Sequence, residues 1–180
     1  MRVIAGALKG RRLKAPTWEG LRPTSDKLRE TLFNILAPRI LNARVLDGYA
    51  GTGAVGIEAL SRGAAHVTFV ERDRRAQALI ADNLAHCGIQ EGYAIIRASV
   101  ARALADLAGA SFDIMVFDPP YNQPPGDVVL AAAASRLAAD GVLVIEHARR
   151  VVAPEWAGRL VRTRDVPSGD SALAFYSWPR

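Results

Sequence analysis

Cysteine, lysine, aromatic side chains and long apolar runs are all scarce in this sequence of 180 residues. The single cysteine, Cys87, excludes an internal disulfide and a cysteine-based zinc site, and it favours a reducing, cytoplasmic compartment. The three histidines show no metal-ligand spacing, so we expect no metal. No apolar run reaches the roughly 18 residues of a membrane span, and the opening MRVIAGALKGRRLK lacks the apolar segment of a secretory signal. We therefore expect neither a membrane protein nor a disulfide-rich secreted one.

Positive charge is abundant but unevenly placed. The net charge is +5 at pH 7, yet residues 1–44 hold ten basic and three acidic residues, while the remainder is slightly acidic. This asymmetry predicts a polyanion-binding element attached to a near-neutral domain. A solvated basic segment without a partner would have the same composition. Half of the residues are hydrophobic, which is enough for a packed core.

The order of elements predicts a mostly parallel sheet. Residues 2–16 are typical of two short strands around the turn LKGR, and TSDKLRETLFNIL, residues 24–36, of a helix that ends before Pro38. Beyond Arg44 short apolar runs alternate with helical patterns, which indicates βαβ units. We expect strands at 44–48, 66–71, 93–98, 112–118 and 141–147, and helices at 54–63, 73–88, 100–109 and 126–140.

The end of the chain breaks this alternation. Residues 158–178 predict two strands around the turn PSGD, and these must pair antiparallel because no helix separates them. The expected fold is therefore a seven-stranded, doubly wound α/β sheet closed by an antiparallel hairpin. We expect residues 1–43 to form a basic hairpin-plus-helix extension and residues 44–180 to form the main domain.

A glycine-rich turn follows the first strand of the alternation. Gly51, Gly53 and Gly56 have the spacing G-x-G-x-x-G between a strand and a helix, and Glu71 ends the next strand. Such glycines allow the backbone to approach a ligand closely, and such an acid can accept ribose hydroxyls. The pattern predicts a site for an adenosine-containing cofactor, although a tight turn without a ligand is the alternative.

Asp47 helps to identify that cofactor. Its carboxylate, just before the glycines, would repel a pyrophosphate and attract an ammonium group. S-adenosylmethionine is therefore favoured over a nicotinamide dinucleotide, and a nicotinamide-dependent oxidoreductase stays as an alternative. After the third strand of the alternation, Ser99 or the Val100 N–H could meet the adenine, although Ser99 could equally cap a helix.

The stretch FDIMVFDPPY ends a buried strand with an acid, two prolines and a tyrosine. A carboxylate on Asp118 and the carbonyl of Pro119 could accept both N–H groups of an exocyclic base amine and direct its lone pair at a methyl donor. Tyr121 could stack on a flipped base. The alternative is a rigid turn in which Asp118 caps the following helix.

Four stretches together resemble one family. RVIAGALKGRRL, LRPTSDKLRETLFNIL, VLDGYAGTGAVGIEALSRGA and FDPPY, covering residues 1 to about 147, are similar to the RsmD family of bacterial 16S rRNA guanine-N2 methyltransferases. The resemblance implies a Rossmann-like class I methyltransferase fold and S-adenosylmethionine as the cofactor. It also implies methylation of guanine 966 in 16S rRNA, within the small ribosomal subunit or a late assembly intermediate.

The resemblance also assigns roles to individual residues. Asp118, Pro119 and Tyr121 fall on the target-base positions, and Arg22, Pro23 and Thr24 on a motif that closes over donor and substrate. The methyl-donor positions are Asp47, Tyr49, Ala50, Gly51, Thr52, Gly53, Glu71, Arg72, Ser99, Val100 and Asp118. The basic N-terminal residues implied to face rRNA are Arg2, Lys9, Arg11, Arg12 and Lys14.

Two alternatives remain from the residues alone. A DNA adenine-N6 or cytosine-N4 methyltransferase would share the donor site and the DPPY chemistry, but 180 residues show no separate target-recognition domain. The nicotinamide-dependent oxidoreductase lacks a Tyr-x-x-x-Lys proton relay. A third, non-catalytic alternative is an RNA-binding scaffold with a vestigial donor site, which the intact DPPY turn argues against.

Overall fold

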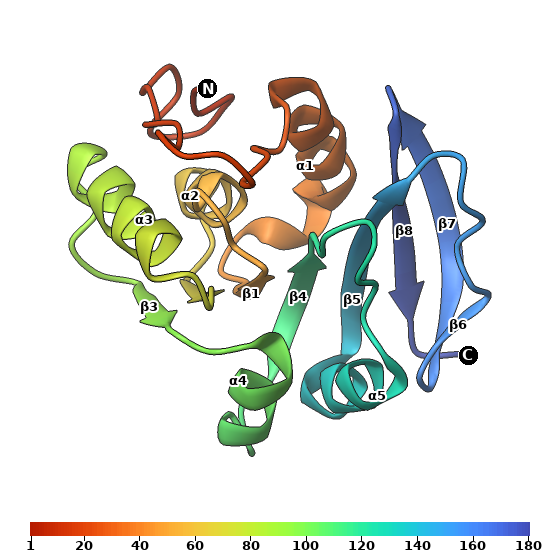
Figure 1. Ribbon diagram of the computed structural model, residues 1–180. Helices are drawn as coiled ribbons and strands as arrows, with labels where there is room; N and C mark the ends of the chain where they lie inside the picture. Colours follow the sequence, from red (N-terminus) through yellow and green to blue (C-terminus); the bar gives the residue numbers. More distant parts are fainter.

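The computed structural model describes residues 1–180. The chain folds into one sheet with five helices packed around it (Figure 1). The helices are α1 Asp26–Ile40, α2 Ala54–Ser61, α3 Arg74–His86, α4 Val100–Asp106 and α5 Asp127–Arg136. The strands are β1 Arg44–Gly48, β2 His66–Val70, β3 Tyr93–Ile96, β4 Phe112–Phe117, β5 Leu137–Ala148, β6 Trp156–Ala157, β7 Leu160–Ser168 and β8 Ser171–Ser177. No helix combines the length and apolar character needed to cross a membrane.

The eight strands form one sheet in the order β3-β2-β1-β4-β5-β8-β7-β6. Strands β1 to β5 pair in parallel, and β5-β8, β7-β8 and β6-β7 pair antiparallel. The predicted doubly wound sheet with a closing hairpin is therefore confirmed. The predicted number of seven strands is one too few, because the two-residue strand β6 adds an outer edge that is too short to produce a sequence pattern.

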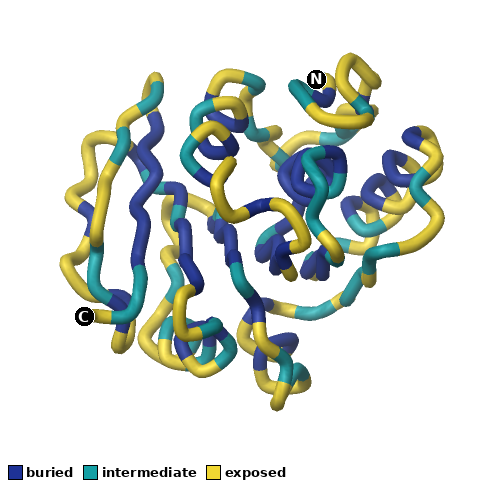
Figure 2. Tube along the Cα trace, turned by 180° about the vertical axis from the view of Figure 1, so that it is seen from behind, coloured by how far each residue is buried: buried dark blue, intermediate teal, exposed yellow.

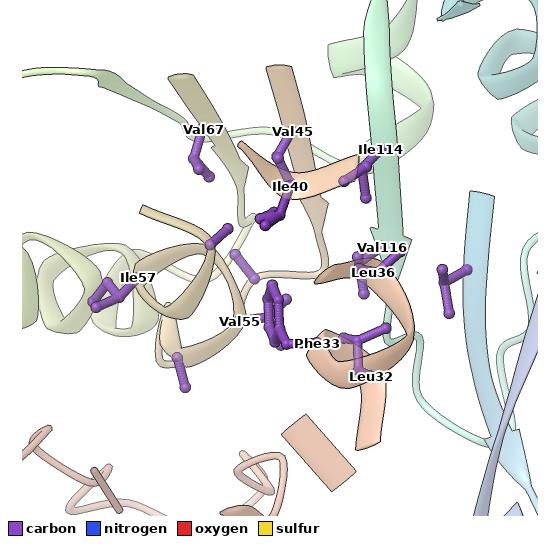
Figure 3. Packing of buried hydrophobic residues seen from close by; sticks show 14 of the residues in the cluster. Leu32, Phe33, Leu36, Ile40, Val45, Val55, Ile57, Val67, Ile114 and Val116 are labelled. Atoms are coloured by element: carbon purple, nitrogen blue, oxygen red, sulfur yellow. The ribbon is translucent and has the colours of Figure 1, made fainter. Parts of the chain in front are cut away.

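Each face of the sheet carries its own core. Helices α1, α2 and α3 cover one face, and α4 and α5 cover the other (Figure 1). Successive residues of a strand point to opposite faces, so Val45 packs with the α1–α3 core and Leu46 with the α4–α5 core. Figure 3 shows Leu36 of α1 beside Val116 of β4, and Phe33 of α1 beside Val55 of α2, in the first of these cores. The central strands are buried along most of their length (Figure 2).

The N-terminal segment forms a minimal hairpin that docks onto α2. The two expected strands shorten to one antiparallel bridge, Arg2 to Arg12, beside which the Val3 N–H donates to the Arg11 carbonyl and the Leu13 N–H to the Met1 carbonyl. The backbone N–H groups of Ile4 and Ala5 instead donate to the carboxylate of Glu58, at 2.8 and 3.1 Å. These donors are therefore committed to a side chain and cannot pair in a strand ladder. Residues 1–43 also contribute Val3, Leu13 and the apolar face of α1 to the core of the sheet. The division of the chain at residue 44 stays a prediction.

The helices do not end at the expected residues, and for α1 and α5 the difference has a clear cause. Pro38 lies inside α1, which continues to Ile40. The proline is tolerated because it lies in the exposed last turn, where the carbonyl of Asn34 can face water. Helix α5 ends at Arg136, four residues earlier than expected, because the buried Leu137 pairs with Phe112 and begins β5.

Candidate active site

A cavity of about 670 Å³ lies at the carboxyl ends of the parallel strands. The chain crosses from the β3 side of the sheet to the β4 side next to β1, which makes this the topological switch point where such sheets bind ligands. Most residues that the sequence predicted for donor and target line it together. They are Asp47, Tyr49, Ala50, Gly51, Thr52, Glu71, Arg72, Ser99, Val100, Asp118, Pro119, Tyr121, Arg22, Pro23 and Thr24.

The glycine-rich turn is held open by the acid that follows β2. Glu71 accepts a hydrogen bond from the Gly51 N–H at 2.8 Å with one carboxylate oxygen and from the Asp73 N–H at 3.0 Å with the other. Tyr49 and Gly51 have φ of 59° and 57°, so the backbone between them turns through the left-handed region. Glu71 thus shapes the turn, and each of its oxygens keeps an acceptor lone pair for a ligand.

Gly53 is not among the residues that line this cavity, and its contact with the cofactor stays a prediction. Its φ of 81° puts it at the N-cap of α2, where a Cβ would approach Ile80 to 3.2 Å. Gly56 has a packing role as well, since a Cβ there would come within 2.2 Å of the buried Phe69 ring. Of the three glycines in the motif, only Gly51 faces the cavity.

Asp47 is the buried acid of the donor half of the cavity. Its side chain is 3% exposed and accepts a hydrogen bond from the Gly56 N–H at 2.9 Å. Burial raises the pKa of Asp47 well above its usual range, and the charge of Glu71 raises it further, against the opposing hydrogen bond from Gly56. A carboxylate in this position gains most from a cationic ligand, because the protein places no basic side chain against it.

The opposite wall of the donor half is formed by the start of α4 and by Tyr49. Ser99 caps α4 by accepting a hydrogen bond from the Arg102 N–H at 3.2 Å. It also lines the cavity, so its role as a helix cap does not exclude the predicted contact with a cofactor. The Tyr49 ring packs edge-on against Phe117, with ring centroids 5.8 Å apart. Burial raises the pKa of the Tyr49 hydroxyl, and this ring therefore enters the site as a neutral phenol.

The DPPY turn forms the target half of the cavity. Asp118 follows β4 and accepts a hydrogen bond from the Thr24 hydroxyl at 3.2 Å. Burial raises the pKa of Asp118 well above its usual range, and the neighbouring carboxyl of Glu146 raises it further. Pro119 is buried, whereas Tyr121 is 41% exposed and its hydroxyl lies 2.5 Å from Ser171 Oγ. The turn is thus tied to α1 on one side and to the β7-β8 hairpin on the other.

Glu146 and Ser171 are site residues that sequence reasoning missed. Glu146 lies on β5 and lines the cavity beside Asp118. The sequence contains a pattern that could have identified Glu146: it is an acid near the end of the apolar run GVLVIEH, as Asp118 is at the end of its own strand. Ser171 has no such signal, since only the folding of the terminal hairpin brings it to Tyr121.

The basic N-terminal side chains lie outside the cavity. None of the five predicted RNA contacts lines it, and all five are exposed: Arg2, Lys9, Arg11, Arg12 and Lys14. They project from the segment docked on α2, which Figure 1 places above the carboxyl ends of the strands on the α1–α3 side. At the cavity wall itself, Arg75 lies over the Trp18 ring, 5.0 Å from its centroid.

Comparison with known proteins agrees with this geometry. The family described as Conserved hypothetical protein 95 matches residues 1–177. YlbH of Bacillus subtilis is 39% identical over 180 residues, which are 98% of each chain. Ribosomal RNA small subunit methyltransferase D of Escherichia coli is 44% identical over 123 residues, which are 68% of this chain and 61% of that protein.

A solved structure described as a putative methyltransferase, yhhF of Escherichia coli, shares the fold. It superposes with a TM-score of 0.82 and 34% identity, over 98% of this chain and 96% of that one. The match covers the N-terminal segment, the parallel sheet and the terminal hairpin alike. The chain therefore belongs to the RsmD family of methyltransferases, the family described as Conserved hypothetical protein 95, and has its Rossmann-like class I fold.

Proposed function

We propose that this protein transfers a methyl group from S-adenosylmethionine to the exocyclic N2 of a guanine in 16S rRNA, guanine 966 by family resemblance. The observation that carries the proposal is the single cavity that joins the glycine turn to the DPPY turn. A methyl donor and an acceptor base must meet within one site. Here the glycine turn predicted for the donor and the DPPY turn predicted for the base line the same cavity. The family membership and the name of the Escherichia coli relative support rRNA as the acceptor.

The donor half fits S-adenosylmethionine in charge and shape. Asp47 is a buried carboxylate without a basic partner, which suits the ammonium group of the donor and opposes a pyrophosphate. Glu71 keeps acceptor lone pairs that can bind ribose hydroxyls. Ser99 and Val100, which line the same cavity, are proposed to contact the adenine. When bound, S-adenosylmethionine supplies a methyl group on a cationic sulfonium and leaves as a neutral thioether.

The acceptor half orients the amine. The lone pair of an exocyclic base amine is delocalised into the ring, so the amine is a weak nucleophile. Ionised Asp118 accepts one N–H, and the Pro119 carbonyl accepts the other, which draws the nitrogen toward a tetrahedral geometry. As the nitrogen gains its methyl group, one N–H bond breaks and its proton passes to the Asp118 carboxylate. Tyr121, exposed at the cavity edge, stacks on the flipped base.

The RNA surface extends from the cavity to the N-terminal segment. Arg22, Pro23 and Thr24 close over the cavity, and the exposed basic residues on the docked segment contact RNA phosphates. We therefore propose that residues 1–43 form the RNA-facing part and residues 44–180 the catalytic part. The substrate is the small ribosomal subunit or a late assembly intermediate, which places the reaction in the cytoplasm.

A DNA amino-methyltransferase would use the same donor half. Incubation with labelled S-adenosylmethionine of small subunits and, separately, of duplex DNA decides between the two acceptors. We expect label in the rRNA, mapped by mass to an N2-methylguanine, and none in DNA; label in DNA alone contradicts the proposal. Membership in a methyltransferase family removes the nicotinamide-dependent oxidoreductase.

Two variants test the division of the cavity. Asp118→Ala is expected to abolish methyl transfer while donor binding, measured by calorimetry, survives. Glu71→Ala is expected to weaken donor binding. Asp127→Ala, at an exposed aspartate at the start of α5, is the matched control and leaves both unchanged. Loss of donor binding in Asp118→Ala would instead place Asp118 in the donor half.

A further inference from the structure

A second carboxylate lies beside Asp118 at the target end of the cavity. Strands β4 and β5 pair in parallel with Phe117 opposite Ile145, so the following residues, Asp118 and Glu146, also lie side by side on the same face of the sheet. Both line the cavity, and the Glu146 carboxyl lies close enough to raise the pKa of Asp118. A base that enters this half therefore meets two neighbouring acceptor groups.

Glu146 has no donor of its own in the protein. Its side chain is only 9% exposed, yet no N–H group donates to it, and the nearby Thr24 hydroxyl donates to Asp118 instead. The other buried acids are partnered: Glu58 accepts from backbone N–H groups and arginines, and Asp47 accepts from Gly56. Glu146 lines the cavity, so a ligand bound there can donate hydrogen bonds to its carboxylate oxygens. The position of Glu146 thus points to a ligand that carries hydrogen-bond donors.

Guanine carries two such donors side by side. On its Watson–Crick edge, the ring N1–H is next to the N2 amino group, and flipped bases are read along this edge. Adenine and cytosine instead place a lone pair on the ring nitrogen beside their amino group. Two neighbouring carboxyl groups offer acceptor oxygens that match the two donors of the guanine edge, whereas adenine and cytosine would place a lone pair against one of them.

We propose that Glu146 determines specificity for guanine by accepting the N1–H of the target base, while Asp118 accepts the N2–H. This inference rests on the proposed function and deepens it. Glu146 takes no part in the transfer of the methyl group or the proton; it fixes the ring so that the N2 amine lies at Asp118. Thr24, bonded to Asp118, leaves Glu146 free for this contact.

The test uses small subunits reconstituted with rRNA that carries either guanine or 2-aminopurine at the target position. 2-Aminopurine keeps the N2 amine, but its N1 bears a lone pair and no hydrogen. The wild-type protein is expected to favour guanine by about tenfold or more in kcat/KM, the effect of one hydrogen bond to a charged group. In Glu146→Gln, the side-chain amide can donate to the bare N1, and the guanine preference is expected to fall by about tenfold or more.

Controls separate recognition from folding. Glu146→Asp keeps the charge and is expected to keep the guanine preference at a lower rate. Glu91→Gln, the same substitution at an exposed glutamate, leaves both rates unchanged. Donor affinity measured by calorimetry verifies that each variant is folded.

Equal slowing of both templates in Glu146→Gln would overturn the inference, as would loss of the guanine preference in a donor-binding Glu146→Asp. If the wild-type protein leaves guanine in small subunits unmodified, the proposed function itself is wrong and the inference falls with it. An active wild type whose preference Glu146→Gln leaves unchanged refutes the inference alone.

Discussion

The Thr24 hydroxyl donates a hydrogen bond to Asp118 Oδ2 at 3.2 Å, across 94 residues of sequence. This bond links the N-terminal motif at the start of α1 to the DPPY turn after β4. It orients the carboxylate and favours its ionised form, which the proposed transfer requires.

Removing that hydroxyl should slow methyl transfer without affecting donor binding. Thr24→Val keeps the shape of the side chain but loses the bond, and we expect kcat to fall by about tenfold, as for one hydrogen bond to a charged group. Thr24→Ser keeps the hydroxyl and is expected to stay close to the wild-type rate. Single-turnover methylation of small subunits measures both. An equal loss of rate in the valine and serine variants would contradict a role for the hydroxyl.

Glu58 is expected to be essential for stability. It is fully buried, pairs with Arg29 at 3.2 Å and Arg62 at 2.9 Å, and accepts the backbone N–H groups of Ile4 and Ala5. Glu58→Ala leaves the buried Arg29 without this partner and is expected to cost about 3–5 kcal/mol in the free energy of unfolding. Urea unfolding measures this cost.

The control for Glu58 is an exposed ion pair. Asp106 pairs with Arg102 on the surface of α4, and Asp106→Ala is expected to change stability by less than about 1 kcal/mol. Because Glu58 holds Ile4 and Ala5, early proteolysis within the N-terminal segment should accompany its loss. Equal stability of the two variants would show that Glu58 does not organise this segment.

Local patterns were sufficient to predict the sheet and most of the cavity. Each parallel strand is a short apolar run, and the last residues of the run or the residue after it fall at the carboxyl edge. Asp47, Glu71 and Asp118 could therefore be assigned to one site in advance. The hairpin β7-β8 was predictable for the same reason, from two apolar runs around PSGD.

Relationships between distant segments were not predictable. The expected N-terminal strands shorten to a single bridge, and Glu58, on α2, accepts the backbone N–H groups of Ile4 and Ala5 beside it. The pairing of Asp118 with Glu146 depends on the register of β4 and β5, and that register shifts between Phe112 and Ile114. A shift of one residue exchanges the faces of a strand. The sequence could therefore indicate that Glu146 lies near the end of its strand, but not on which face of the sheet its side chain lies.

Asp47 is expected to reduce the stability of the donor-free protein at neutral pH. Burial raises its pKa above the value in the unfolded chain. Its contribution to stability is therefore fully present below the unfolded pKa and is lost as the pH rises through the folded pKa. Asp47→Asn avoids this loss. It should raise Tm at neutral pH by about 2–4 °C for each kcal/mol gained in the free energy of unfolding. The same variant is expected to lose donor binding.

Calorimetric melts at neutral and mildly acidic pH test the origin of this effect. The gain of Asp47→Asn should shrink in acid, where the wild-type carboxyl is protonated. Asp82→Asn, at an exposed position on α3, provides the matched control without a gain. A gain that is constant with pH would assign the effect to packing rather than to the charge.

The exposed basic residues of the N-terminal segment are expected to control the salt dependence of RNA binding. Lys9, Arg11 and Arg12 lie outside the cavity and can meet phosphates without touching the target base. Replacing all three by alanine should reduce the slope of log K against log salt by roughly two to three, because each phosphate that a basic side chain neutralises adds about 0.7–0.9 to it. Arg102→Ala, on α4, should leave the slope unchanged. Equal slopes for the triple variant and the wild type would remove this segment from the interface.

The rate of methyl transfer is expected to fall in acid, with an acid limb set by Asp118. Burial, and then the Glu146 carboxyl, raise the pKa of Asp118, so its ionised form accumulates only as the pH rises through that raised value. The groups that face it are Glu146 and Asp47, which raise the pKa, and Thr24, which lowers it.

Glu146→Gln removes a negative charge and should move the acid limb to lower pH, whereas Thr24→Val removes the opposing hydrogen bond and should move it to higher pH. Profiles of kcat at saturating small subunits measure both shifts. Movement of the two variants in the same direction would show that another group sets the limb, because only Asp118 lies between the two partners.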